Sequence, residues 1–301
     1  MDEVKKPPVR RGGSGGVRMV DLTHARHDRA HVLAPGLFRS LAPGDRKKLK
    51  LDITYDFGDR EQIEFKGFEP LGVLEMRVLQ GLVALAGPDG LILDDHDKAG
   101  PAGDQLMLDL FEPDPVVRAA KLKPASLVVQ DSFRRLAREI GMDEGGASVK
   151  KIRKAVERMF GVTIFVQSRN GKRLGMRLLA GYASDEGTGD LYVALNPRIA
   201  AAVMGDTPHA RIDLAEVRQL ESDPARLIHQ HLCGWLDPGK AGEVGIDRLA
   251  GYVWPDPATN AATIRSRVMR VRKALREIEG LGWRVEVLKK DVWRFIRPRI
   301  R

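Results

Sequence analysis

The order of apolar and polar residues predicts a chain of short helices and strands. Residues 51–55 and 62–65 alternate between the two types on either side of an Asp-Phe-Gly-Asp turn, which is typical of a β-hairpin. Residues 71–86 are mostly apolar and predict a buried helix. Residues 87–114 are rich in Gly, Asp and Pro and predict a loop, with a short strand near residues 105–110.

The middle of the chain continues this alternation of elements. Asn170-Gly171 separates two alternating runs, residues 162–167 and 172–179, and Asn-Gly in this setting is a strong signal for a two-residue hairpin turn. The other elements predicted here are helices at residues 130–140, 148–160 and 197–204 and a strand at residues 191–195.

Helix signals dominate the last third. Asp223 and Pro224 suit the N-cap and first position of a helix that runs to residue 236. Gly280 suits the end of a long helix over residues 261–279. The other elements predicted here are helices at residues 213–220 and 246–253 and a hairpin with strands at residues 284–288 and 292–296.

Two parts of the chain share local sequence and the predicted order of elements. Residues 133–140 align with 246–253, residues 154–161 align with 273–280, and a predicted hairpin follows each pair. A short helix, a turn, a longer helix and a hairpin are the order of a winged helix-turn-helix. We therefore predict an α+β fold with two tandem winged helix-turn-helix domains. The predicted parts are a basic N-terminal arm (1–40), an N-terminal winged-helix domain (41–207) and a C-terminal winged-helix domain (208–301).

Composition narrows the class of protein. The 301 residues are 43% hydrophobic, which is enough for two domains of ordinary size. One cysteine excludes an internal disulfide and indicates a reducing compartment. The apolar run at residues 71–86 is interrupted by polar residues and is shorter than the roughly 20 residues of a membrane span. Without a signal-peptide pattern, we expect a cytoplasmic protein with no membrane partner.

The net charge of +9 is concentrated at the two ends of the chain. The net charges are +4 for residues 1–40, −1 for residues 41–207 and +6 for residues 208–301. A basic arm together with a basic C-terminal domain is the pattern expected of a protein that binds a polyanion.

The predicted helix at residues 261–279 is the strongest candidate for reading DNA. Residues 264–276 carry six cations and no acid, whereas a solvated helix face normally alternates in sign. At about 100° per residue, one apolar stripe is expected to face the core. The stripe comprises Ile264, Val268, Val271, Leu275 and Ile278.

The polar side chains of this helix divide into two predicted groups. One group points away from the stripe near the helix N-terminus, where recognition helices meet base edges: Thr263, Ser266, Arg267 and Arg270. Arginine suits this task because its planar fork binds guanine through two hydrogen bonds. The other group lies nearer the core and suits phosphate contacts: Arg265, Arg272 and Arg276. Lys273 is a further candidate for DNA binding on the same helix.

The corresponding helix of the first copy is also basic. It contains Glu157 and lies in a domain with almost no net charge, so phosphate anchoring and simple solvation both remain open. Its cations are Lys150, Lys151, Arg153, Lys154 and Arg158. The hairpin turns add candidate backbone contacts at Arg169, Lys172, Arg173, Lys289 and Lys290.

Enzymatic and metal chemistry have weaker support. No Gly-x-x-x-x-Gly-Lys-Ser/Thr loop is present, so no ATPase is expected. His229 and His231 lie two residues apart on a predicted helix and diverge by about 200°, so they do not chelate one ion; we expect His231 inside and His229 outside. His27 and His31 have the spacing of a zinc-protease helix but no evident third ligand, which favours a docking or capping segment. We expect no catalytic residue, metal or cofactor, and interpret Cys233 as packing.

Several segments resemble the RepC replication initiators of IncQ-type plasmids. The resemblance runs from about residue 22 to residue 298 and departs mainly in the N-terminal arm and in the loop at residues 93–103. The segments that carry it are residues 26–39, 50–59, 182–186, 191–197, 232–240 and 251–255.

The resemblance implies an initiator that binds repeated sequences (iterons) in double-stranded plasmid origin DNA. It also implies opening of an adjacent A+T-rich segment, recruitment of a separate plasmid-encoded helicase and primase, and exchange between monomers and homodimers. Two other functions stay open: a winged-helix transcriptional regulator, and a DNA-nicking enzyme that attaches through Tyr182, Tyr192 or Tyr252.

Overall fold

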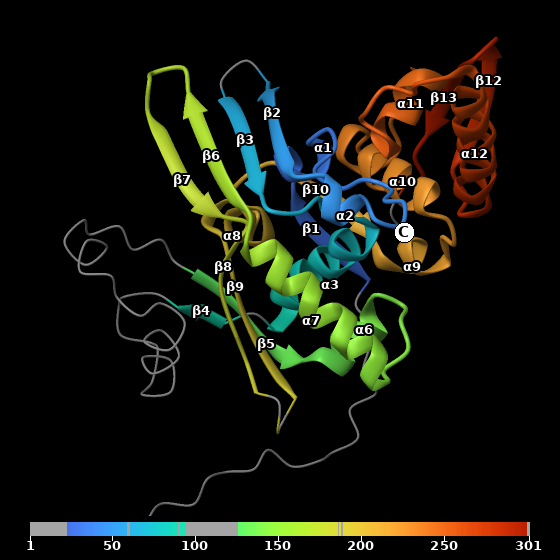
Figure 1. Ribbon diagram of the computed structural model, residues 1–301. Coiled ribbons are helices and arrows are strands. Elements are labelled where there is room, and N and C mark those ends of the chain that lie inside the picture. The colour runs from blue at the N-terminus through green and yellow to red at the C-terminus, as the bar shows by residue number, and fades with distance from the viewer. Residues whose placement is uncertain are drawn as a thin grey trace, which may run out of the picture.

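The computed structural model describes residues 23–58, 61–89, 91–93, 126–185, 187 and 189–299. Helices and strands alternate along these segments in a mixed α/β fold (Figure 1). None of the described helices is both long and apolar enough to cross a membrane. The predicted strand near residues 105–110 lies outside the described residues.

The last third, here called the C-terminal unit, packs helices beside a three-stranded antiparallel sheet. Strand β11 (Ala241–Gly245) pairs with β13 (Val292–Ile296), which pairs with β12 (Arg284–Lys289), so the sheet order is β11-β13-β12. Strand β11 runs directly into helix α11. The helices are α9 (Leu214–Gln219), α10 (Asp223–Trp235), α11 (Ile246–Val253) and α12 (Ala261–Gly280).

The N-terminal unit repeats this order of elements around a second sheet. Its strands lie in the order β4-β5-β9-β8, formed by β4 (Leu91–Leu93), β5 (Ser126–Ser132), β9 (Asp190–Leu195) and β8 (Leu179–Ser184). Strand β5 runs directly into helix α6, as β11 runs into α11. The helices of this unit are α3 (Val73–Asp89), α6 (Phe133–Glu139), α7 (Gly146–Phe160) and α8 (Pro197–Met204).

A separate four-stranded sheet stands beside these helices. It is formed by two hairpins in the order β2-β3-β6-β7: β2 (Leu51–Phe57), β3 (Glu61–Gly67), β6 (Thr163–Ser168) and β7 (Arg173–Arg177). Figure 1 shows the two hairpins side by side at one end of the molecule. The hairpin that corresponds to β12–β13 is therefore β8–β9, because it pairs with the strand before α6, and not the predicted β6–β7.

Residues 23–40 are folded, unlike the predicted basic arm. Strand β1 (His24–Asp28) pairs antiparallel with β10 (His209–Asp213), and helix α1 (Arg29–Leu33) packs against α10. Leu37 and Phe38 are buried. This segment joins the beginning of the chain to the start of the C-terminal unit, and it is followed by the short helix α2 (Asp45–Lys48).

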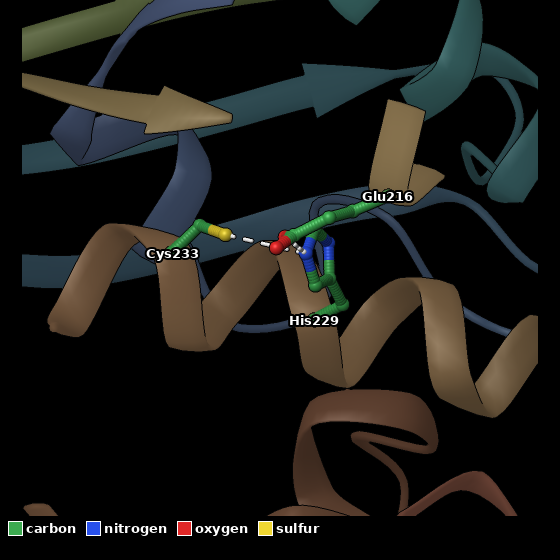
Figure 2. Close-up of side chains that lie close together, drawn as sticks. All are labelled: Glu216, His229 and Cys233. Carbon is green, nitrogen blue, oxygen red and sulfur yellow. Dashed lines mark hydrogen bonds and ion pairs between the residues drawn. The ribbon is translucent and has the colours of Figure 1, made fainter. Parts of the chain in front are cut away.

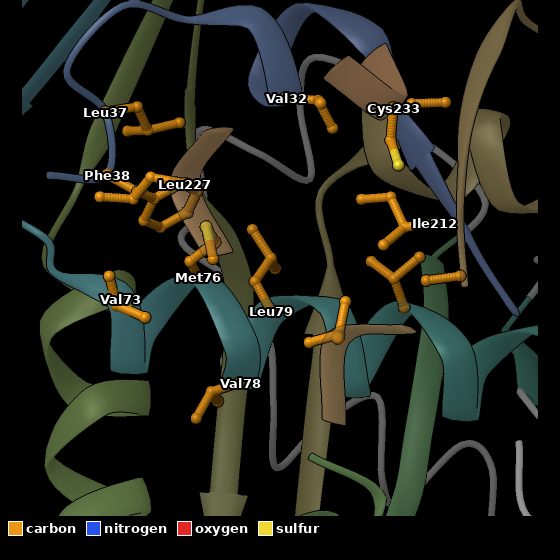
Figure 3. Packing of buried hydrophobic residues seen from close by; sticks show 14 of the residues in the cluster. Val32, Leu37, Phe38, Val73, Met76, Val78, Leu79, Ile212, Leu227 and Cys233 are labelled. Carbon is orange, nitrogen blue, oxygen red and sulfur yellow. The ribbon is translucent and has the colours of Figure 1, made fainter. Parts of the chain in front are cut away.

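One hydrophobic core runs through both units, with helix α3 at its centre. Figure 3 shows Leu37 and Phe38 beside Leu227 of α10, above Met76 of α3. The Nε2 atom of Gln80 on α3 donates to Oε1 of Gln230 on α10 at 2.7 Å, so a buried amide pair also links the units. Burial of these side chains supplies most of the stabilisation between the two halves.

Three local predictions differ from the structure. Residues 130–132 belong to strand β5 instead of a helix, and the helix begins after its N-cap, Ser132. Ser222, not Asp223, caps α10. The Asn-Gly turn uses three residues, because Ser168 and Lys172 pair across it and Gly171 adopts a φ of 83°.

Candidate nucleic-acid interface

Helix α12 stands partly clear of the rest of the C-terminal unit. The Asn260 side chain caps its N-terminus by accepting from the Thr263 backbone N–H at 2.8 Å. Its buried residues begin only at Val271 and continue with Ala274, Leu275 and Ile278. The prediction that Ile264 faces the core is wrong: the residue is 48% exposed, and no residue of α12 before Val271 is fully buried.

The outer surface of α12 is basic, as its sequence predicts. The first acid on the helix, Glu277, accepts from the backbone N–H groups of Glu221 and Ser222 at 3.0 Å, so its carboxylate is turned toward the start of α10. The cations that are exposed on α12 are Arg265, Arg270, Arg272, Lys273 and Arg276, and Ser266 is exposed among them.

A tryptophan in the preceding loop holds two of the predicted base-reading arginines. The Cζ atoms of Arg267 and Arg270 lie 5.5 and 4.7 Å from the Trp254 ring centre, within cation–π range. Arg267 Nη1 also donates to the backbone O of Asp256 at 2.7 Å. Together with Thr263 and Ser266, these residues line a shallow surface hollow. The loop therefore restricts the two arginines before any ligand binds.

The hairpin β12–β13 is tied to α12 by its turn. Arg272 Nη2 lies 3.1 Å from Asp291 Oδ1, and the Asp291 backbone O accepts from the Ile246 N–H at 2.9 Å. Lys289 and Lys290 are exposed at the same turn. Arg272 thus has a partner within the protein, while the two lysines extend the basic surface of α12.

Only some of the cations on α7, the basic helix of the N-terminal unit, are available for DNA contact. Lys150, Lys151 and Lys154 are exposed, and the Arg153 guanidinium lies over the Phe133 ring at 5.0 Å. Arg158 instead binds buried Glu75, with Nη2 to Oε1 at 2.6 Å. The structure gives Arg158 a role in holding α7 to α3, which lends no support to its predicted DNA contact.

Glu75 is stabilised in the core by two arginines. Arg46 Nη2 lies 2.9 Å from Glu75 Oε2, opposite Arg158, and the Gly72 N–H donates to the same carboxylate at 2.7 Å. Burial acts to raise the pKa of Glu75, but Arg158, Arg46 and the Gly72 N–H outweigh it and lower that pKa. A charge buried in this way needs every one of these partners.

The predicted contact residues at the β6–β7 turn differ in their surroundings. Arg169 and Lys172 are exposed. Arg173 Nη1 lies 2.8 Å from Glu64 Oε1, and its guanidinium covers the Phe165 ring at 4.7 Å. Arg173 is also exposed, but its ion pair and ring contact give it a role in the sheet, whereas Arg169 and Lys172 have neither among the described residues.

The predicted capping role of the first histidine segment agrees with the structure. Asp28 caps α1 by accepting from the His31 N–H at 3.0 Å, and its Oδ1 lies 2.6 Å from His31 Nδ1. Arg198 Nε lies 3.4 Å from Asp28 Oδ2. Burial and the neighbouring His31 lower the pKa of His27 to about 4, so its buried ring is neutral.

The prediction that His229 lies outside is wrong, whereas His231 packs partly inside. His229 is fully buried, whereas His231 is partly buried and stacks on Tyr252 with ring centres 3.5 Å apart. His229 Nε2 lies 2.6 Å from Glu216 Oε2 and 3.6 Å from Cys233 Sγ (Figure 2). These contacts hold one ring nitrogen, Nε2, inside the core, and periodicity alone does not reveal them.

Glu216, His229 and Cys233 are the one group of His, Cys and carboxylate side chains among the described residues whose ligand atoms all lie within 4.8 Å. Glu216 also accepts from Trp283 Nε1 at 3.3 Å. His229 Nε2, Cys233 Sγ and the Glu216 carboxylate thus already have hydrogen-bond partners within the protein. The group is a polar contact between α9 and α10, and its hydrogen bond to Trp283 extends it to the residue directly before β12.

Two of the three tyrosines considered for strand cleavage have raised pKa values. Burial raises the pKa of Tyr182, which packs against Phe160, and of Tyr252, which stacks on His231. Tyr192 Oη lies 3.4 Å from Gln130 Nε2. A tyrosine nucleophile needs a lowered pKa or an adjacent base, and these contacts supply neither to Tyr182 or Tyr252.

Sequence reasoning missed the loop that positions the arginines. In the sequence, Trp254 and Asp256 only mark where the short helix at residues 246–253 ends, because helical periodicity does not predict the contacts of a loop. An aromatic residue directly before an arginine-rich helix is the one available signal.

A comparison of sequences places this chain among replication proteins. A sequence profile of the family described as "Replication protein C (RepC)" matches residues 19–299. No match was found among curated protein sequences.

Solved structures share the fold at low sequence identity. Two crystal structures of domains 2 and 3 of RctB superpose with a TM-score of 0.54 at 11% and 12% identity, covering 91% and 89% of this chain and 99% and 96% of theirs. The Pi initiator protein in complex with iteron DNA superposes with a TM-score of 0.50 at 12% identity, covering 93% of this chain and all of its own.

Proposed function

The chain belongs to the RepC family of replication proteins, and we propose that it initiates plasmid replication by binding iterons in double-stranded origin DNA. The observation that carries this proposal is the exposed basic surface of α12, which has no acid among residues 261–276. The likeness in fold to the Pi initiator, which was solved with iteron DNA, supports it.

We interpret the two units as tandem winged helix-turn-helix domains. Both have a helix, a strand, two further helices and a hairpin whose second strand pairs with the first strand, which is the winged-helix order. Helix α12 then lies in a major groove, and α7 lies in a neighbouring groove of the same site.

The exposed side chains suggest how the contacts divide. Arg267, Arg270, Thr263 and Ser266 border the hollow at the N-terminal half of α12 and are proposed to contact base edges. Exposed Ile264 and Met269 stand among the cations, and apolar side chains suit thymine methyl groups. The proposed phosphate contacts are Arg265, Lys273, Arg276, Lys289, Lys290, Lys150, Lys151, Lys154, Arg169 and Lys172.

The proposal includes partners beyond DNA. A non-enzymatic initiator opens the adjacent A+T-rich segment through its binding energy and needs a separate helicase and primase to continue. We propose that the chain recruits both in the cytoplasm and exchanges between monomer and homodimer.

Footprinting on the origin of the parent plasmid tests the proposal. Protection of evenly spaced direct repeats is expected, because each bound chain covers one iteron. Protection of a promoter palindrome would instead identify a transcriptional regulator, and strand cleavage with a divalent metal would identify a nicking enzyme.

A further inference from the structure

Residues 34–40, here called the strap, connect the two units at the loop that holds the DNA-facing arginines. The Arg39 backbone N–H donates to the Leu71 O just before α3, at 3.0 Å. The next residue, Ser40, donates its N–H to the Val253 O at the end of α11, also at 3.0 Å. Consecutive residues of the strap therefore bind one unit each.

The strap also packs closely on the loop between α11 and α12. Gly36 has a φ of 78°, and a Cβ built there would lie 3.0 Å from a Pro255 side-chain atom. Glycine is needed both for the backbone conformation and for this close approach. The loop that contains Trp254 and Asp256 thus packs against the strap in close van der Waals contact.

A side-chain ion pair completes the connection. Arg39 Nη1 lies 2.7 Å from Asp256 Oδ2, with the Arg39 side chain only 12% exposed. The backbone O of the same Asp256 accepts from Arg267 Nη1. One residue thus joins Arg39 of the strap to Arg267 of α12, next to the Trp254 ring that holds Arg267 and Arg270.

We propose that Arg39 is a positioning residue for DNA recognition. It fixes the Trp254–Asp256 loop, and through that loop it sets the direction of Arg267. Its backbone bond to Leu71 sets the loop relative to the N-terminal unit. Arg39 acts without touching DNA, so it affects sequence discrimination more than general affinity. This inference rests on the proposed function.

The test is a double-mutant cycle between Arg39→Ala and Arg267→Ala in the full chain. The probes are a duplex selected from a randomised pool by the wild-type chain and a scrambled duplex of the same composition. The readout is the ratio of the two Kd values. Arg29→Ala is the matched control, because it removes the same charge as Arg39→Ala. Arg29 also links the N-terminal segment to the C-terminal unit, since its Nη2 forms an ion pair with Asp237 Oδ1 at 2.5 Å.

Arg39→Ala is expected to lower the discrimination ratio about three- to tenfold, and Arg29→Ala less than about twofold. The double variant should lose no more than Arg267→Ala alone, because Arg39 acts through Arg267. Arg39→Lys should retain more discrimination than Arg39→Ala, since it keeps a cation beside Asp256. If Arg39→Ala does not fold, Asp256→Ala takes its place in the cycle, because it removes the ion pair and keeps the backbone O.

Two results would overturn the inference alone: a ratio for Arg39→Ala within about twofold of that for Arg29→Ala, or losses that multiply in the double variant. A ratio unchanged by Arg267→Ala would overturn the inference together with the proposed DNA contact of α12. The two failures are therefore distinguishable.

Discussion

Single side chains in this protein are held by neighbours that lie far away in sequence. Periodicity predicts that Arg267 and Arg270 face outward; Arg270 is exposed, and Arg267 is half-buried against the preceding loop. Periodicity does not reveal that Trp254 and Asp256 hold them, or that Arg158 is withdrawn from the surface by Glu75. These contacts depend on loops and on the packing of separate helices, which local sequence does not encode.

The buried pair His229 and Glu216 gives the protein a pH-dependent stability. Burial opposes a charge on the ring, but Cys233 and Glu216 outweigh it and raise the pKa of His229 from 6.5 to about 10. A group whose folded pKa is raised contributes its stabilisation fully below the unfolded pKa and loses it as pH rises through the folded pKa.

We therefore expect the unfolding free energy of the wild-type chain to fall, relative to His229→Gln, between pH values of about 6.5 and about 10. Urea unfolding of both chains at several pH values in this window measures the difference. Parallel pH profiles of the two chains would show that His229 does not titrate in this range.

At the scale of elements, helices were easier to predict than strands. Helix α8 and helix α11 have the predicted bounds, because caps and apolar periodicity are local signals. Strands β1, β8, β10 and β11 were not predicted, and β4 falls in a predicted loop. Strands β1 and β10 pair with each other although they lie far apart in the sequence, so no local signal announces them.

The N-terminus of α12 depends on one cap. Asn260→Ala leaves the Thr263 N–H without its side-chain acceptor, which should lower the unfolding free energy by about 1 kcal/mol. Denaturant unfolding measures this loss. Asn260→Asp is the control, because its carboxylate oxygen can accept from the same Thr263 N–H and should retain most of the stability; an equal loss from it would refute the role of the cap.

At the scale of the whole molecule, the exposed cations of α12 and the centre of the hydrophobic core lie in different units. The N-terminal unit carries the centre of the core in α3, and the C-terminal unit presents the densest basic surface. The net charge of +6 over residues 208–301 follows from the sequence itself. The sequence-based prediction misjudged residues 23–40, because a strand that pairs with a distant partner resembles an arm when only local sequence is considered.

Salt should weaken DNA binding steeply if this basic surface contacts phosphates. Neutralising about 6 to 10 phosphates lowers affinity roughly 10³- to 10⁵-fold between about 50 and 200 mM salt. Lys289→Ala combined with Lys290→Ala should reduce the slope of log Kd against log salt by about 2. An affinity independent of salt would rule out the electrostatic account.

The most direct test of the account compares two double variants that remove equal charge. Arg267→Ala with Arg270→Ala removes the proposed base contacts, and Lys289→Ala with Lys290→Ala removes proposed phosphate contacts. Affinities for the selected and scrambled duplexes, measured at one salt concentration, give the discrimination of each chain. The arginine pair should reduce discrimination by about 1 to 3 kcal/mol per lost bidentate contact, and the lysine pair should weaken both duplexes equally. Equal losses on both duplexes from the arginine pair would contradict the claim that α12 reads DNA sequence.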